Sequence, residues 1–225
     1  MQDHNFERAV KVFEKLQSRF PYGRYAQQAQ MEIAYAYYKQ GEPAPSLGAI
    51  DRFIKQYPKN AHLDYMYYLK GLNNFDENLV SIMNALSGQD PAERDPKSLH
   101  ESFETFKVLV TRFPNSPYAA DTRLRMQFLL STMAASDIHV ASYYLRRGAY
   151  VAALNRAKDV LIDYPNTPQT HDALQIMVQA YDAMGMKELH DDTQRILKLN
   201  VASNETAPVA KESPTNNHSW WQFWE

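Results

Sequence analysis

The chain has 225 residues, with 24 lysines and arginines against 26 aspartates and glutamates, so its formal net charge is −2. Nearly balanced charge argues against a nucleic-acid-binding protein, which usually carries a strongly basic patch. The absence of cysteine excludes disulfides, zinc-thiolate sites and cysteine nucleophiles.

An aromatic residue followed by proline recurs along the chain, at Phe20-Pro21, Tyr57-Pro58, Phe113-Pro114 and Tyr164-Pro165. Twelve residues before each proline the side chain is small, and eight and five residues before it the side chains are apolar. These spacings share one face of a helix, which the proline then ends. The repeat predicts an all-α tetratricopeptide repeat (TPR) solenoid, a superhelix of about five helix-turn-helix repeats.

The first helix of a TPR needs a small residue, then an aromatic residue three positions later. Ala34 with Tyr37 and Ala141 with Tyr144 fit this pattern, and glycine follows each tyrosine after four residues, at the expected turn between paired helices. Gly71 matches the small helix position in the repeat register rather than a turn.

In chain order, residues 1–20 supply only the second helix of an incomplete first repeat, and the solenoid is expected to span 1–199. Its N-terminal half covers about 1–75. A segment rich in Asn, Asp, Ser, Gly and Pro, 76–97, is interpreted as a loop insertion. The C-terminal half, 98–199, is expected to include one long helix between Tyr118 and Arg147, because this stretch contains no proline or glycine.

Residues 200–225 are expected to form a disordered tail by composition. The tail ends in aromatic residues, Trp220, Trp221, Phe223 and Trp224. Because exposed aromatic surface is costly, they suggest a docking peptide, an interfacial membrane anchor or a segment that folds back on the solenoid. One hypothesis is that the tail occupies, within the same chain, the groove in which the solenoid would bind its ligand.

Three tyrosines lie close together at Tyr65, Tyr67 and Tyr68. Adjacent residues of a helix point about 100° apart, so at least one of these rings is expected to line a surface or groove.

A search for reactive chemistry finds no catalytic, cofactor-binding or metal-binding motif. The histidines lack the spacing of a helical metal site, and phosphate-binding glycine loops and nucleophile elbows are missing. The sequence therefore predicts a binding protein rather than an enzyme, with no cofactor.

Longer motifs resemble a specific TPR family. They are Arg19–Gln30, Met31–Lys39, Ala49–Ile54, Arg94–Pro96, Phe113–Ser116 with Tyr118, and Tyr143–Ala152 with Asn155-Arg156. Together they are similar to the BamD (ComL) family of outer-membrane assembly lipoproteins, over about residues 6–199.

The resemblance implies a scaffold of the β-barrel assembly (BAM) complex on the periplasmic face of the outer membrane of a Gram-negative bacterium. Implied partners are the BamA periplasmic domains, other BAM lipoproteins and unfolded outer-membrane proteins, without nucleic acid. The family is held by a lipid on an N-terminal cysteine. That cysteine, a signal peptide and the first helix are missing here, so the chain is expected to be a shortened form.

The resemblance also assigns two sets of residues. The targeting signal of unfolded outer-membrane proteins would be received by Tyr22, Arg24, Tyr25 and Gln28. BamA would be bound by Arg146, Arg147, Asn155 and Arg156. Ordinary packing tyrosines and solvated arginines are the competing interpretations. The alternative function is a periplasmic peptide-binding adaptor of the CpoB cell-envelope type.

Overall fold

The computed structural model describes the backbone of residues 5–86 and 96–206, and the side chains of 5–75 and 99–200. These ranges contain nine helices: α1 (Phe6–Arg19), α2 (Arg24–Lys39), α3 (Pro43–Gln56), α4 (Leu63–Leu86), α5 (Pro96–Arg112), α6 (Ala119–Arg146), α7 (Tyr150–Asp163), α8 (Gln169–Ala183) and α9 (Lys187–Thr206). The all-α repeat fold is confirmed. Helix α1 packs on α2 and is followed by four helical pairs, α2–α3, α4–α5, α6–α7 and α8–α9.

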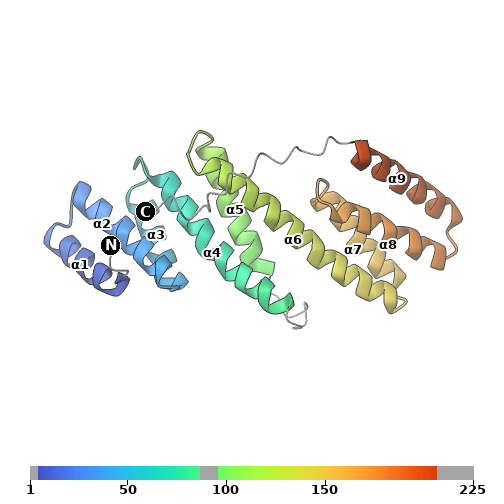
Figure 1. The fold of residues 1–225 in the computed structure, drawn as a ribbon, viewed down its shortest axis with the longest axis horizontal. Coiled ribbons are helices and arrows are strands. Elements are labelled where there is room, and N and C mark those ends of the chain that lie inside the picture. The colour runs from blue at the N-terminus through green and yellow to red at the C-terminus, as the bar shows by residue number, and fades with distance from the viewer. Residues whose placement is uncertain (1–4, 87–95, 207–225) are drawn as a thin grey trace.

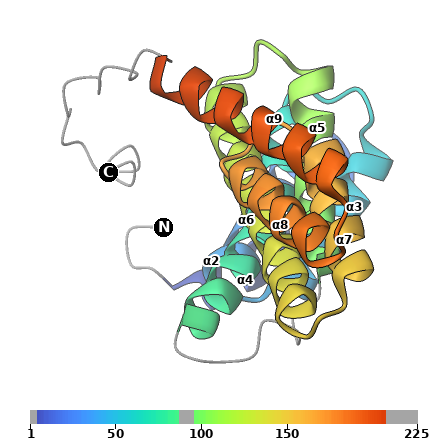
Figure 2. The ribbon, with the colours of Figure 1, turned by 90° about the vertical axis from the view of Figure 1, so that its right-hand side faces the viewer.

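The helices follow one another along an elongated molecule (Figure 1). Seen from one end, the first helices α2, α4 and α6 lie on one side and the second helices α3, α5 and α7 on the other (Figure 2). Each helix packs on its neighbours in sequence, and first helices also touch across repeats, α2 with α4 and α6 with α8. The molecule is therefore a two-layered solenoid.

All four aromatic-proline pairs close a helix as predicted. The backbone N–H of the aromatic residue donates to the carbonyl four residues earlier: Phe20 to Leu16, Tyr57 to Phe53 and Phe113 to Leu109, each at 2.8 Å, and Tyr164 to Val160 at 3.0 Å. The following proline has no N–H to continue the ladder, so each helix ends there.

The small residues of the repeat lie where paired helices come closest. The Ser46 hydroxyl donates to the Ala34 carbonyl at 2.9 Å, which joins α3 to α2. The Ser102 hydroxyl donates to the Gly71 carbonyl at 3.2 Å, which joins α5 to α4. A larger side chain at either position would push the two backbones apart.

The core is divided along the solenoid, as expected where each repeat packs only on its neighbours. One cluster of buried side chains runs from Ile33 to Leu69 around Phe53, and the other runs from Phe75 to Tyr181 around Phe106. Both phenylalanines are fully buried.

Two predicted boundaries were wrong. Residues 76–86, expected in the loop insertion, continue α4 to Leu86, and residues 96–97 begin α5. The composition of the segment hid an apolar pattern at Leu79, Ile82, Met83 and Leu86, which has helical spacing. Residues 200–206, assigned to the tail, extend α9 because no proline or glycine interrupts them before Pro208.

The remainder of the predicted loop, 87–95, and of the tail, 207–225 with its four aromatic residues, lies outside the described residues. The predicted long helix is confirmed as α6, with 28 residues. Within the described ranges, no helix combines the length and apolar character needed to cross a membrane.

Candidate peptide-binding and docking surfaces

A cavity of about 640 Å³ lies where the first turns of α2 face the loop between α3 and α4. From α2 it is lined by Arg24, Gln27, Gln28 and Met31. Arg24, Gln28 and Met31 are four and then three residues apart, so they form one stripe on the helix. The opposite wall follows the closing pair Tyr57-Pro58. The cavity therefore joins the start of one repeat to the end of the same repeat.

Asn60 fixes the loop wall of this cavity. Its side-chain N–H donates to the Gln27 carboxamide oxygen at 2.8 Å, and its own oxygen accepts from the His62 backbone N–H at 2.8 Å. The two hydrogen bonds hold the loop against α2 and set the width of the cavity.

The cavity favours an anionic group. Arg24 and Lys59 are cationic, and none of the described lining residues is acidic. The Arg24 guanidinium lies 5.1 Å from the centre of the Tyr25 ring and donates to the Tyr25 hydroxyl at 3.2 Å. A carboxylate entering the cavity would meet a guanidinium that an aromatic ring holds in position.

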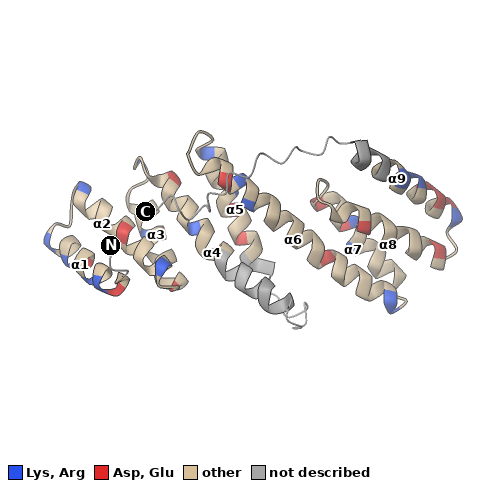
Figure 3. Ribbon diagram, viewed as in Figure 1, with Lys and Arg blue, Asp and Glu red and all other residues tan. Residues whose placement is uncertain are grey.

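A second polar surface lies at the other end of the solenoid, at the turn from α6 to α7. Arg146 and Arg147 are exposed there, and Figure 3 shows basic residues at this turn and no large region of one sign elsewhere on the described ribbon. The Arg147 guanidinium lies 5.4 Å from the centre of the Tyr143 ring and donates to its hydroxyl at 3.2 Å. Tyr143 is itself 45% exposed, so the pair presents an aromatic face with a fixed cation.

Comparison with known proteins identifies the family. The family model for outer membrane lipoproteins (YfiO) matches residues 1–196. Outer membrane protein assembly factor BamD of Neisseria meningitidis serogroup B is 42% identical over 221 residues, which cover 98% of this chain and 81% of that protein. The chain belongs to the BamD family of outer membrane lipoproteins.

Other BamD proteins match over similar lengths. The Vibrio cholerae protein is 36% identical over 192 residues, covering 85% of this chain and 79% of its own length. The Xylella fastidiosa protein is 38% identical over 201 residues, covering 89% and 68%. The similarity therefore extends over the whole solenoid rather than a single repeat.

Two of the four signal-binding residues expected from the BamD resemblance line the cavity, namely Arg24 and Gln28. Tyr22 and Tyr25 do not line it. They are 88% and 58% exposed and flank the start of α2.

Lys59, Asn60 and His62 also line the cavity, although no motif in the sequence marked them as binding residues. The available signal was their position just after a closing proline, at the start of the next repeat. First helices of successive repeats begin along the same edge of a solenoid, so this segment lies beside the start of α2.

The four residues expected to bind BamA do not converge on one point. Arg146 and Arg147 lie at the α6–α7 turn, whereas Asn155 and Arg156 are about two turns further along α7. All four are exposed. Arg156 also forms an ion pair with Asp137 of α6 at 3.6 Å, so it has a structural partner within the BamD-family chain.

Proposed function

We propose that this chain is a non-enzymatic scaffold of the outer-membrane β-barrel assembly machinery. It would hold BamA and the C-terminal targeting signal of unfolded outer-membrane proteins at the same time. The family membership supports the assembly role, since the relatives are outer membrane protein assembly factors. Holding two partners on one solenoid raises their effective concentration near each other.

The cationic cavity carries the signal-binding part of this proposal. A polypeptide C-terminus offers a carboxylate, which Arg24 and Lys59 can pair, and Gln28 can hydrogen-bond the last peptide groups. Tyr22 and Tyr25 would contact the aromatic residue at the end of the signal from the rim of the cavity. Tyrosine supplies aromatic contact area with a hydroxyl that tolerates water, which suits an exposed rim.

The α6–α7 surface is proposed to dock BamA. Arg147 above Tyr143 resembles a binding hot spot, because arginine and tyrosine are enriched among residues that dominate interface energies. Arg146, Asn155 and Arg156 would extend the contact along α7. Other BAM lipoproteins would bind elsewhere on the solenoid, and an N-terminal lipid anchor would hold the protein on the periplasmic face of the outer membrane.

The test is binding of the purified chain to the periplasmic domains of BamA from the same organism, measured by isothermal titration calorimetry. Arg147→Glu should weaken binding by about tenfold or more, as expected for a hot spot. Arg156→Gln is the companion variant, because Arg156→Glu would also set two carboxylates together at Asp137.

Each result has a distinct meaning. Loss of binding with Arg147→Glu supports BamA docking at the α6–α7 turn. If neither substitution changes the affinity for the BamA domains, the scaffold role stands but the docking site lies elsewhere on the solenoid. No binding at micromolar concentration would instead favour a periplasmic peptide-binding adaptor.

A further inference from the structure

Helix α9 exposes a row of large apolar side chains at one end of the solenoid (Figure 1). Leu189, Ile196 and Leu199 are 47–66% exposed. They are seven and three residues apart, so they share one face of the helix. We call this row the α9 stripe. A terminal helix of a repeat array normally presents a polar outer face to water, so the stripe calls for a ligand that covers it.

Packing within the solenoid leaves the stripe uncovered. The second helices α3, α5 and α7 each pack between two first helices, whereas α9 packs extensively only on α8 among the described helices. The contact with α8 buries Thr193 and partly buries Leu197. The three residues of the stripe remain in solvent.

The surroundings of the stripe favour an aromatic ligand with little net charge. Arg195 and Asp192 form an ion pair on α9 at 2.8 Å, and Lys198 is exposed. Charges of both signs do not select a polyanion or a polycation. A guanidinium or ammonium group beside an apolar surface can instead lie over the face of an aromatic ring.

The sequence that follows α9 contains such a ligand. Trp220, Trp221, Phe223 and Trp224 lie within five residues and include all three tryptophans of the chain. Each such ring removes about 150–250 Å² of surface from water when it is covered, so the group gains free energy by packing on apolar side chains. These residues lie beyond the part of the chain that the structure describes.

The stretch that joins α9 to these aromatic residues has a suitable length. Helix α9 ends at Thr206, and 13 residues, 207–219, precede Trp220. A chain of this length spans about 20 Å on average. At 1.5 Å per residue, Ile196 lies about 15 Å from Thr206 along the helix and Leu189 about 26 Å. Because a linker gives the highest effective concentration where its average length matches the span, the stripe lies within the favoured range.

The cationic cavity is a less favourable site for the same aromatic residues. It is formed by α2 and the α3–α4 loop, toward the end of the molecule opposite α9 (Figure 1). A span well beyond the average length of the connecting chain lowers the effective concentration. The cavity also selects an anionic group through Arg24 and Lys59, rather than a cluster of rings.

We propose that the aromatic segment 220–224 packs on the α9 stripe of its own chain and caps this end of the solenoid. Its rings would cover Leu189, Ile196 and Leu199, with Arg195 and Lys198 at the border. The contact would keep the stripe from associating with other molecules. It is independent of the proposed binding of BamA and of the targeting signal, since neither of those surfaces includes α9.

Tryptophan fluorescence tests this contact, because every tryptophan of the chain lies in the segment. Emission, excited where tyrosine does not absorb, and its quenching by acrylamide are measured for the full chain and for a synthetic peptide of residues 207–225. The full chain should emit at shorter wavelength than the peptide and be quenched less. Equal emission and equal quenching would overturn the proposal.

Ile196→Gln tests the place of the contact. Glutamine has a helix propensity at least equal to that of isoleucine, so the substitution removes apolar surface without weakening the helix. The variant should lose most of the shift to shorter wavelength and be quenched nearly as strongly as the peptide. Leu199→Gln is a second variant, and circular dichroism melts show whether each chain is folded. Folded variants that keep the emission and quenching of the parent would contradict docking on the stripe.

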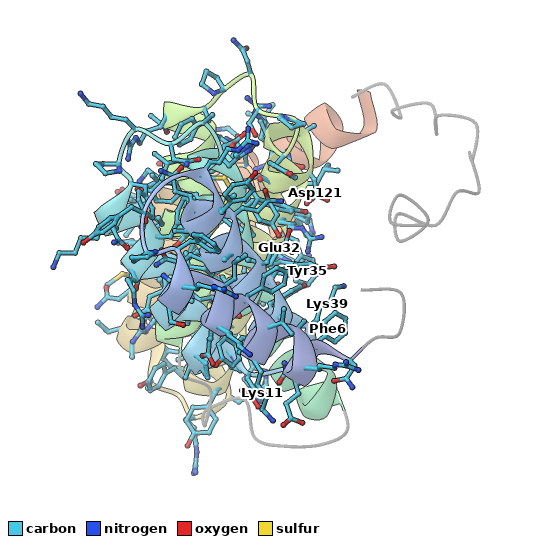
Figure 4. All side chains as sticks on the ribbon, turned by 90° about the vertical axis from the view of Figure 1, so that its left-hand side faces the viewer. Phe6, Lys11, Glu32, Tyr35, Lys39 and Asp121 are labelled. Atoms are coloured by element: carbon cyan, nitrogen blue, oxygen red, sulfur yellow. The ribbon has the colours of Figure 1, made fainter. Side chains whose placement is uncertain are left out.

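Val12→Gln is the matched control. Val12 is another exposed β-branched residue, on α1. Figure 4 shows its neighbour Lys11 at the end of the molecule nearest the viewer, with α9 behind the other helices. The control should change neither emission nor quenching. An equal effect of Val12→Gln and Ile196→Gln would overturn the stripe as the site.

Two other results would also overturn the proposal. If Arg24→Ala, and not Ile196→Gln, shifts the emission to that of the peptide, the aromatic segment lies in the cavity instead. If the shift to shorter wavelength disappears when the full chain is diluted, the segment packs on a second copy of the chain rather than on its own α9.

Discussion

Gly71 lies where α4 and α5 come closest, and its missing side chain lets the Phe106 ring lie against the α4 backbone. A Cβ atom at this position would overlap that ring. The Gly71 carbonyl also accepts a hydrogen bond from the Ser102 hydroxyl, so two residues of α5 contact this one glycine. Because Phe106 is fully buried, its ring has no free space into which to move.

We expect Gly71→Ala to destabilise the protein by about 1–3 kcal/mol through overpacking. Gly48→Ala is the control, because Gly48 is a helical glycine of α3 with no atom near its would-be Cβ. That variant should stabilise by up to about 1 kcal/mol from helix propensity alone. Urea denaturation of both variants measures the difference; a Gly71→Ala chain as stable as the parent would contradict the close approach.

Between elements, α6 and α7 are linked by the ion pair of Asp137 with Arg156. Burial raises the pKa of the Asp137 carboxyl, and the neighbouring Arg156 opposes this rise, whereas Asp159 and Asp163 add to it. The folded protein therefore keeps this proton to a higher pH than the unfolded chain does. Titration of this carboxyl therefore lowers the free energy of unfolding as the pH rises through the interval just above its ordinary pKa of 3.8.

Asp137→Asn removes this titration. We therefore expect the melting temperature of the variant, relative to that of the parent, to increase as the pH is raised from about 4 to about 6. Thermal melts followed by circular dichroism at several pH values measure this. Asp182→Asn, which changes an exposed carboxylate of α8, is the control. A difference from the parent that stays constant with pH would argue against the raised pKa.

Over the length of the solenoid, the two proposed binding surfaces lie far apart. The cavity is made by α2 and the α3–α4 loop, and the arginine surface lies at the α6–α7 turn. Separate cores support the two regions, one around Phe53 and the other around Phe106. A solenoid of this kind can carry two partners without moving one to admit the other.

We therefore expect the BamA periplasmic domains and a synthetic peptide that ends in phenylalanine with a free carboxylate to bind together. The affinity for BamA, measured with and without saturating peptide, should change by no more than about twofold, because independent sites have no coupling free energy. Mutual exclusion of the two ligands would mean that the surfaces overlap or that binding at one reshapes the other.

Features that depend on short stretches of chain could be predicted from the sequence. The closing aromatic-proline pairs, the small residue at Ser46 and Gly71 in its helix position were all confirmed. The different directions of neighbouring tyrosines were confirmed too, since the Tyr68 ring stacks on Tyr118 whereas the Tyr67 hydroxyl accepts a hydrogen bond from Arg112 of α5. In each case a local property decides the feature: the missing N–H of proline ends a helix, and the helix period sets the direction in which a side chain points. The errors at residues 76–86 and 200–206 were also local, and came from weighing composition above periodicity.

The binding surfaces depend on contacts that no local pattern contains. The cavity joins Arg24 to Lys59, and an aromatic contact joins Tyr68 of α4 to Tyr118 at the start of α6. Such residues meet only when helices and successive repeats pack together. Stacking is set by the crossing angles and spacing of whole helices, which sum many small packing contacts over the core. The sequence therefore shows that the chain is a repeat scaffold, whereas the packing of its first helices decides which side chains form one surface.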